Sequence, residues 1–270
     1  MRTASQIAIT CLFGVTIVAA QNQPSSYFRT ACIKVQPGKW SEFMEFSNGM
    51  ATKVMQAAAE NGDFSTATLL RSVLPSGEEA RCDFISVTSY RGAPPAPLTR
   101  EQLQARIEKA GIGMTGDQFA AKRDVVSRLV SQEIWRSVIS IGDIQKGDYM
   151  FVNFGRTSNM QNYLKFEDTV WKPMAEQWIK EGRMRGWRVN QLFLPAGTEV
   201  KYQITSVDVF PSWDAVFTPL RLQDMMKKVH PDRDYTQTVG EIPKIRDLAR
   251  RELYVVQNRI VAPAASTSNR

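Results

Sequence analysis

The chain contains 270 residues, of which 43% are hydrophobic, 10% aromatic and 23% charged, and its formal net charge is +7. This composition supplies enough apolar material for a packed core and argues against wholesale disorder. One histidine and three cysteines exclude histidine-rich metal sites and zinc ribbons. The sequence has no phosphate-binding loop, dinucleotide fingerprint, HExxH or GxSxG motif, so the motifs exclude several enzyme classes without naming a reaction.

The N-terminus is typical of a secretory signal peptide. Met1 and Arg2 precede the apolar run 7–20, which ends in small residues. The alternative is an uncleaved anchor, but this run is shorter than the roughly 20 residues that span a bilayer. We therefore expect residues 1–20 to be removed and the protein to be exported, to a periplasm or outside the cell, with no transmembrane span after cleavage. Cys11 follows Thr10 and lacks the small preceding residue of a lipidation site.

Export changes the interpretation of the two remaining cysteines, Cys32 and Cys82. Disulfides persist in oxidising compartments, so these two residues are a candidate disulfide pair. The alternative is two small, separately buried thiols in different strands.

The sequence resembles itself at a shift of 120 residues. The segment LPSGEE at 74–79 falls on LPAGTE at 194–199, and Ser86-Val87 falls on Ser206-Val207. At a shift of 119, the tripeptide that starts at Glu133 falls on the one that starts at Glu252. The pattern predicts two tandem repeats, 26–143 and 146–262, followed by a disordered tail at 263–270.

The first elements of the two repeats are predicted to be a strand and a helix. Both strands are rich in β-branched and aromatic residues, and the first helix shows apolar residues every three or four positions. Ser158 and Gln161 have the spacing of a capping box at the start of the second helix. The predicted ranges are strands at 28–35 and 149–154, and helices from Trp40 to about Glu60 and from Ser158 to Glu181.

A hairpin, a helical region and a last strand follow in each repeat. Pro-x-Gly turns join the hairpin strands, because Pro presets the negative φ and Gly takes the positive one. Helix and strand compete for the last segments, and their β-branched residues favour strands. The predicted ranges are hairpins at 66–74 with 80–90 and 186–194 with 199–210, helical regions at 99–130 and 212–250, and last strands at 133–141 and 252–261.

The resulting order, β-α-β-β-α-β, is the ferredoxin-like unit, an antiparallel sheet with helices on one face. Two such units can bury their bare faces against each other, so we predict an α+β fold in which tandem ferredoxin-like repeats form an intramolecular, pseudo-dimeric α+β barrel. In this element order and in the repeated LPxGxE hairpin, the chain resembles the dimeric α+β-barrel superfamily. It is similar in architecture to antibiotic-biosynthesis monooxygenase-like and NIPSNAP-like proteins.

The resemblance implies a fold that hosts cofactor-free oxygenation, haem breakdown and simple binding. Haem chemistry usually needs an axial imidazole, and His230 precedes Pro231, a position typical of a surface loop. We therefore expect no cofactor and no metal site.

Glu133 and Glu252 are candidate catalytic residues because they occupy equivalent positions in the two repeats. Inside a barrel, desolvation would raise the pKa of a carboxyl group and suit it to acid or base work. The alternative, which we favour, pairs each glutamate at the surface with an arginine such as Arg128 or Arg250.

Aromatic residues in the predicted strands are candidates for lining a ligand pocket. An ordinary core would contain the same residues. The candidates are Trp135, Trp187, Tyr202 and Tyr254, whereas Trp40, Trp171 and Trp178 belong to the first helices and are expected to pack.

The densest positive segment, Lys244 to Arg251, is interpreted as a solvated helix face, and nothing indicates nucleic-acid binding. We expect the protein to bind a small apolar or aromatic molecule, or a protein partner, without catalysis. The alternative is a cofactor-independent, monooxygenase-like enzyme that acts inside the barrel. Whether the chain is an enzyme, and whether it is a monomer or a homodimer, stays open from the sequence.

Overall fold

The structure of the chain is a computed structural model, and it describes residues 26–263. The predicted signal peptide, Cys11 and residues 264–270 of the predicted tail lie outside the described residues. Within residues 26–263, no helix is long and apolar enough to cross a membrane.

The chain folds into two units with the same order of strands and main helical segments, although η2 is present in the first unit and the second has an additional short helix, α7. The first unit runs from β1 to β4 and the second from β5 to β8. The first contains β1 (Ser26–Val35), α1 (Trp40–Phe46), η1 (Ser47–Ala51), α2 (Thr52–Glu60), β2 (Thr66–Leu74), η2 (Gly77–Glu79), β3 (Phe84–Tyr90), α3 (Arg100–Lys109), α4 (Gly116–Val126) and β4 (Ser127–Gly142). The second contains β5 (Tyr149–Arg156), α5 (Met160–Phe166), η3 (Glu167–Trp171), α6 (Lys172–Lys180), β6 (Gly186–Leu194), β7 (Ile204–Phe210), α7 (Trp213–Phe217), α8 (Leu222–Val229), α9 (Tyr235–Ile245) and β8 (Asp247–Val261).

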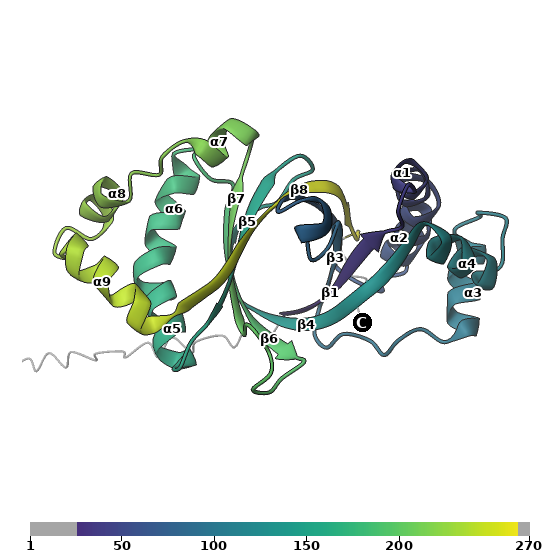
Figure 1. The fold of residues 1–270 in the computed structure, drawn as a ribbon, viewed down its shortest axis with the longest axis horizontal. Coiled ribbons are helices and arrows are strands. Elements are labelled where there is room, and N and C mark those ends of the chain that lie inside the picture. The colour runs from purple at the N-terminus through teal and green to yellow at the C-terminus, as the bar shows by residue number, and fades with distance from the viewer. Residues whose placement is uncertain (1–25, 264–270) are drawn as a thin grey trace, which may run out of the picture.

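The strands form a closed antiparallel barrel in the order β1-β3-β2-β8-β5-β7-β6-β4. Each unit contributes its strands in the order fourth, first, third, second. The long last strands close the barrel, because β4 pairs with β6 and β8 pairs with β2. The predicted α+β barrel is therefore confirmed, and the barrel lies between two groups of helices, one from each unit (Figure 1).

The helices cover the outer faces of the two sheets because strand side chains alternate between faces. In the first unit, Phe43 and Phe46 of the helices pack with Phe84 of β3. In the second unit, Tyr163 and Trp178 belong to the corresponding core. Full burial of such a side chain contributes about 1.5–3 kcal/mol, so these two cores hold the helices against the barrel.

The first helix of each unit contains a π-helical segment, η1 or η3, at positions related by the 120-residue shift. The predicted capping box at Ser158 is wrong. The N-cap is Asn159, whose side chain accepts a hydrogen bond from the backbone N–H of Asn162 at 3.0 Å.

The predicted strand ranges differ from the structure mainly at the hairpins and the last strands. The third strand of each unit starts later than expected, at Phe84 and Ile204, and β4 and β8 start earlier. The segment Lys244 to Arg251 is not a helix face, because α9 ends at Ile245 and β8 begins at Asp247. Its charged residues therefore lie mostly on the first part of a strand.

The LPxG segments form wider loops than the tight turns expected from the sequence. Pro75 and Pro195 both follow cis peptide bonds, and Gly77 and Gly197 both have positive φ. In the first unit the loop also contains η2, which delays the start of β3.

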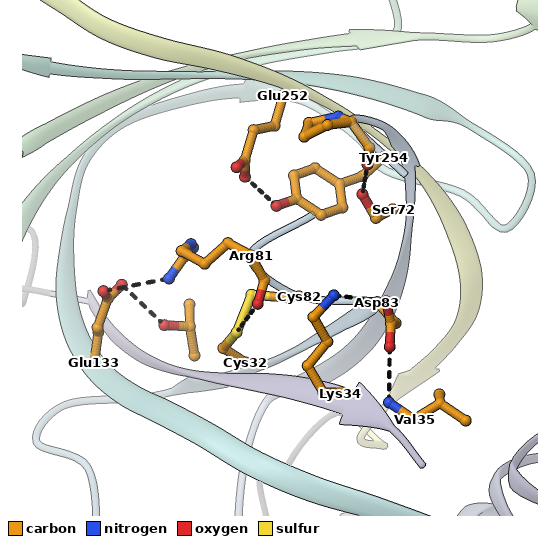
Figure 2. Close-up of a disulfide and its surroundings, with 12 residues drawn as sticks. Cys32, Lys34, Val35, Ser72, Arg81, Cys82, Asp83, Glu133, Glu252 and Tyr254 are labelled. Atoms are coloured by element: carbon orange, nitrogen blue, oxygen red, sulfur yellow. Dashed lines mark hydrogen bonds and ion pairs between the residues drawn. A yellow bond between two sulfur atoms is a disulfide. The ribbon is translucent and has the colours of Figure 1, made fainter. Parts of the chain in front are cut away.

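A disulfide joins Cys32 of β1 to Cys82 in the loop before β3, with a Cα–Cα distance of 5.3 Å (Figure 2). The two cysteines are the candidate pair named from the sequence, although Cys82 precedes the third strand rather than lying in it. Both side chains are buried, and the bridge closes a loop of 50 residues.

We predict that the double substitution Cys32→Ala, Cys82→Ala lowers the free energy of unfolding by about 2–4 kcal/mol, because the unfolded chain loses a long covalent loop. Chemical denaturation of the oxidised protein and of the variant measures this difference. Reduction of the wild type should lower its stability toward that of the variant, and equal stability of the oxidised protein and the variant would contradict the prediction.

Candidate functional site

The barrel encloses a cavity of about 940 Å³. Its wall comes from the inward-facing positions of strands in both units, where side chains alternate with those that face the helices. The apolar part of this wall includes Phe28, Leu70, Ile85, Val87, Trp135, Met150, Val152, Phe154 and Val207. The lumen is thus neither closed nor filled with aromatic rings, and its volume falls in the range of small-molecule sites.

Glu133 of β4 lies at one end of this cavity and accepts several hydrogen bonds. Its Oε1 accepts from the Tyr202 hydroxyl at 2.5 Å, and its Oε2 accepts from Trp135 Nε1 at 3.0 Å and from Thr30 Oγ1 at 3.5 Å. Its side chain is 11% exposed. The donors come from β1, β4 and the loop before β7, so the carboxylate joins elements of both units.

Arg81 supplies the positive charge beside Glu133, with a distance of 3.7 Å between its Nη1 and Glu133 Oε1. Figure 2 shows the Arg81 side chain directed toward Glu133 from the loop that carries Cys82. Its guanidinium also lies over the rings of Phe154 and Tyr202, 5.5 and 5.8 Å from their centres. Burial lowers the pKa of Arg81, but the surrounding Tyr202, Glu133, Tyr254 and Glu252 together raise it above its usual value.

Glu252 occupies the equivalent position on β8 but has a different environment. It is 2% exposed, contacts Arg250, and accepts a hydrogen bond from the Tyr254 hydroxyl. It is not among the residues that line the cavity. Burial, followed by the nearby Glu252, raises the pKa of the Tyr254 phenol well above its ordinary value, so this phenol stays a proton donor.

These positions correct the expectation of surface ion pairs. Arg250 is the expected partner of Glu252, but Arg81 rather than Arg128 lies beside Glu133. Glu252 is buried and Glu133 is mostly buried. The reason is that β4 and β8 form part of the barrel wall, so inward-facing side chains at these positions point toward the lumen rather than the outer surface.

The four candidate aromatic residues have different surroundings, and Trp135 is the one that lines the cavity. Tyr202 stacks on Trp135 with ring centres 6.0 Å apart. Tyr254 belongs to the barrel-side core. Trp187 packs instead among the helices of the second unit, so it does not line the cavity. Tyr202 lies in the loop before β7 and not in a strand.

The other end of the cavity carries arginines. Arg188 of β6 and Arg259 of β8 both line it. Arg259 donates a hydrogen bond to Asp143 at 2.8 Å. Neither arginine was singled out from the sequence, nor was Arg81. The sequence contained one indication of Arg188, because a charged residue between apolar neighbours in a predicted strand, Trp187-Arg188-Val189, can face a polar interior.

The described residues offer no group of three or more His, Cys, Asp or Glu side chains that could hold a metal ion. His230 caps the end of α8, and its Nε2 lies 3.0 Å from the carbonyl oxygen of Val170 in the helix layer. A haem held in the barrel by an imidazole therefore does not fit this chain, whose only histidine is outside the barrel.

No protein-family model and no curated protein sequence matches the chain. A solved structure named "putative monooxygenase" from Fusobacterium nucleatum aligns with 88% of this chain and 95% of its own, with a TM-score of 0.53 and 9% identity. The chain has the dimeric α+β-barrel fold. A "putative monooxygenase" from Lactobacillus acidophilus aligns with 88% of this chain and 99% of its own, with a TM-score of 0.49 and 14% identity. An anthrone oxidase-like protein aligns with 93% of this chain and 99% of its own, with a TM-score of 0.48 and 12% identity.

Glu167 is a further buried acid. It lies outside the barrel, in the π-helical segment η3 among the helices of the second unit. Its side chain is 2% exposed and 3.7 Å from Arg246. Burial raises its pKa to about 7, although Arg246 and Tyr163 lower it. The negative charge of Asp208 on β7 raises the pKa of Glu167 further, and burial also raises the pKa of Asp208 itself.

We predict that stability falls as the pH rises from about 5 to about 7, because a group with a raised pKa binds its proton more tightly in the folded state. The contribution of Glu167 is complete below its ordinary pKa of 4.5 and is lost as the pH passes about 7. Denaturation at several pH values should show a smaller slope for Glu167→Gln, by up to about 1.4 kcal/mol per pH unit. The exposed Glu176→Gln on α6 is the control, and an unchanged slope in Glu167→Gln would contradict the prediction.

We predict that Glu133→Gln lowers the free energy of unfolding by about 1–2 kcal/mol, because it leaves the partly buried Arg81 without its nearest counter-charge. Tyr202→Phe, which removes one hydrogen bond, should cost about 1 kcal/mol. The exposed pair of Glu42 with Lys39 provides the control, since Glu42→Gln should cost at most about 0.5 kcal/mol. Equal losses in Glu133→Gln and Glu42→Gln would show that Glu133 is not part of a desolvated network.

Proposed function

We propose that this protein binds a small apolar or aromatic molecule inside its barrel, without transforming it. The observation that carries the proposal is the cavity of about 940 Å³ between the two sheets. Ligand sites are typically cavities of roughly 300–1,000 Å³ with apolar walls and a few polar groups that fix orientation. This cavity has an aromatic and aliphatic wall, and polar clusters at its two ends.

The hydrogen bonds of Glu133 favour binding over catalysis. Both of its oxygens already accept hydrogen bonds from Tyr202, Trp135 and Thr30. A general base needs an oxygen free to take a proton from the substrate. The geometry therefore gives Glu133 the role of fixing Tyr202 and Arg81 at the inner end of the cavity.

The alternative function is a cofactor-independent, monooxygenase-like enzyme. Its support is the fold, which the chain shares with the Fusobacterium nucleatum protein named above, and the position of Glu133 and Tyr202 next to an open cavity. Binding of a protein partner, by contrast, would not need the cavity.

The origin and location of the protein are part of the proposal. The common strand order of the two units and the repeated LPxGxE segments support a tandem duplication, with a NIPSNAP-like arrangement as one form of it. The apolar N-terminal segment and the disulfide support export, since disulfides persist in oxidising compartments.

We predict that the protein binds the neutral dye phenylnaphthylamine at one saturable site, measured by fluorescence titration. Val87→Trp should weaken binding at least tenfold, because Val87 lines the cavity and the larger ring would occupy it. Val125→Trp, at an exposed position on α4, is the matched control and should bind like the wild type. Unchanged binding in Val87→Trp would place the dye outside the barrel and contradict the proposal.

A further inference from the structure

Arg188 extends along the inner face of β6 toward the charged end of the cavity. It lines the cavity, whereas its neighbours Trp187 and Val189 pack on the helix side. Its guanidinium lies over Gly186, where an added Cβ atom would be 2.9 Å from Arg188 Nη1. The glycine therefore leaves the space that this arginine occupies.

The Nη1 atom of Arg188 is buried and has no hydrogen-bond partner among residues 26–263. An arginine side chain carries five N–H donors, and a buried donor without a partner costs about 1–3 kcal/mol, more when it is charged. Nη1 itself lies against Gly186, and the Arg188 side chain also lines the cavity, so the guanidinium is a charged group at the cavity wall whose donors are not all used by the described part of the chain.

The carboxylates nearby are already engaged by other arginines. Asp143 accepts a hydrogen bond from Arg259 at 2.8 Å, and Asp148 accepts one from Arg185 at 2.8 Å. Among Arg185, Arg188, Arg259, Asp143 and Asp148, the arginines therefore outnumber the carboxylates by one. The Lys172–Asp168 ion pair, which also lines the cavity, adds no net charge.

Burial and, to a smaller extent, the charge of Arg259 lower the pKa of Arg188 to about 10, while Asp143 and Asp148 act in the opposite direction. The side chain remains protonated at neutral pH. The excess charge is therefore present under ordinary conditions and is only partly balanced by the protein.

We propose that the ligand of the cavity is an aromatic anion, such as a carboxylate, whose charged group pairs with the Arg188 guanidinium. The inference rests on the proposed function and specifies its ligand class. A guanidinium presents parallel N–H donors to the two oxygens of a carboxylate, and charge-assisted pairs of this kind are roughly twice as strong as neutral hydrogen bonds. Arg259, engaged by Asp143 but adjacent, adds to the positive potential.

The remaining wall suits the apolar part of such a ligand. Phe28, Trp135 and Phe154 lie toward the opposite end of the cavity. Trp135 pairs with Leu192 and Ser140 pairs with Arg188 in the β4–β6 ladder. The backbone positions of Arg188 and Leu192 are four strand residues apart, roughly 13 Å, so an elongated aromatic ligand would fit between the charged end and the aromatic wall.

The test compares two dyes that differ only by an anionic group. Anilinonaphthalene sulfonate carries a sulfonate on the skeleton of phenylnaphthylamine, so the ratio of their dissociation constants isolates the contribution of the charge. Both are titrated by fluorescence into the wild type, Arg188→Gln, Arg188→Lys and Arg188→Met. Arg128→Gln is the matched control, since it removes one positive charge from an exposed residue of β4 outside the cavity.

We expect Arg188→Gln and Arg188→Met to weaken binding of the sulfonate dye at least tenfold and to change binding of the neutral dye less than about twofold. Arg188→Lys should keep part of the preference for the sulfonate dye over the neutral dye, because lysine retains the charge but not the planar pair of donors. In the absence of dye, Arg188→Met should raise the melting temperature by about 2–4 °C, since it removes a buried donor without a partner.

Three outcomes would overturn the inference. If Arg188→Gln leaves the ratio of the two dissociation constants unchanged, the anionic group does not bind at Arg188, while binding in the cavity stands. If all Arg188 variants, including Arg188→Lys, melt at lower temperatures and lose both dyes equally, the arginine is structural. If the wild type binds neither dye, the proposed function fails and this inference fails with it.

Discussion

The closure of the barrel by β4 and β8 is the constraint on which the interior of this protein depends. Each of these strands pairs with the first strand of its own unit and with the second strand of the other unit. Among residues 26–263 closure leaves no free sheet edge, and it arranges the inward-facing residues around one lumen. Polar side chains buried there must find their partners within the lumen or in a bound molecule.

The two ends of the lumen meet this requirement in different ways. At one end, Glu133 accepts hydrogen bonds from Tyr202 and Trp135, and its negative charge is balanced by the nearby Arg81. The disulfide holds the loop that carries Arg81, and the Cys32 Sγ lies 3.4 Å from the Arg81 carbonyl oxygen. Each end contains one buried arginine nitrogen without a hydrogen-bond partner among residues 26–263, Arg81 Nε and Arg188 Nη1. The difference is that Glu133 lies beside Arg81, whereas no carboxylate forms an ion pair with Arg188 in the described part of the chain.

The sequence predicted the elements well where local signals were strong. The ranges of β2 and β6 agree with the structure, because Gly62 and Gly182 end the preceding helices and prolines follow the strands. The competition between helix and strand in the last segments was resolved correctly by β-branched content. The segment Lys244 to Arg251 was misread because charged residues at helical spacing fit an exposed part of a strand equally well.

The site was harder to predict than the fold, because both faces of these strands are buried. The alternation of side chains places Trp187 and Arg188 on opposite faces of β6, but it does not determine which face packs against the helices. In the structure Trp187 packs against the helices and Arg188 lines the cavity. Arg81 enters the cavity from a loop, where periodicity carries no information. The equivalence of Glu133 and Glu252 was visible in the sequence, but their different surroundings depend on contacts between the units.

The single chain allows the lumen to be asymmetric, which two identical chains would not. In a twofold dimer each inward-facing residue occurs twice, at positions related by the axis. Here the positions related by the shifts of 120 and 119 residues differ, since Thr68 corresponds to Arg188 and Ser140 to Arg259. All four residues line the cavity, and each arginine pairs across the ladder with one of the hydroxyl residues. Arginine at all four positions would place four like charges in a desolvated space, where mutual repulsion is strong. Two arginines, one of them paired with Asp143, concentrate positive charge at one end of the lumen and so favour one orientation of a ligand that has one charged end.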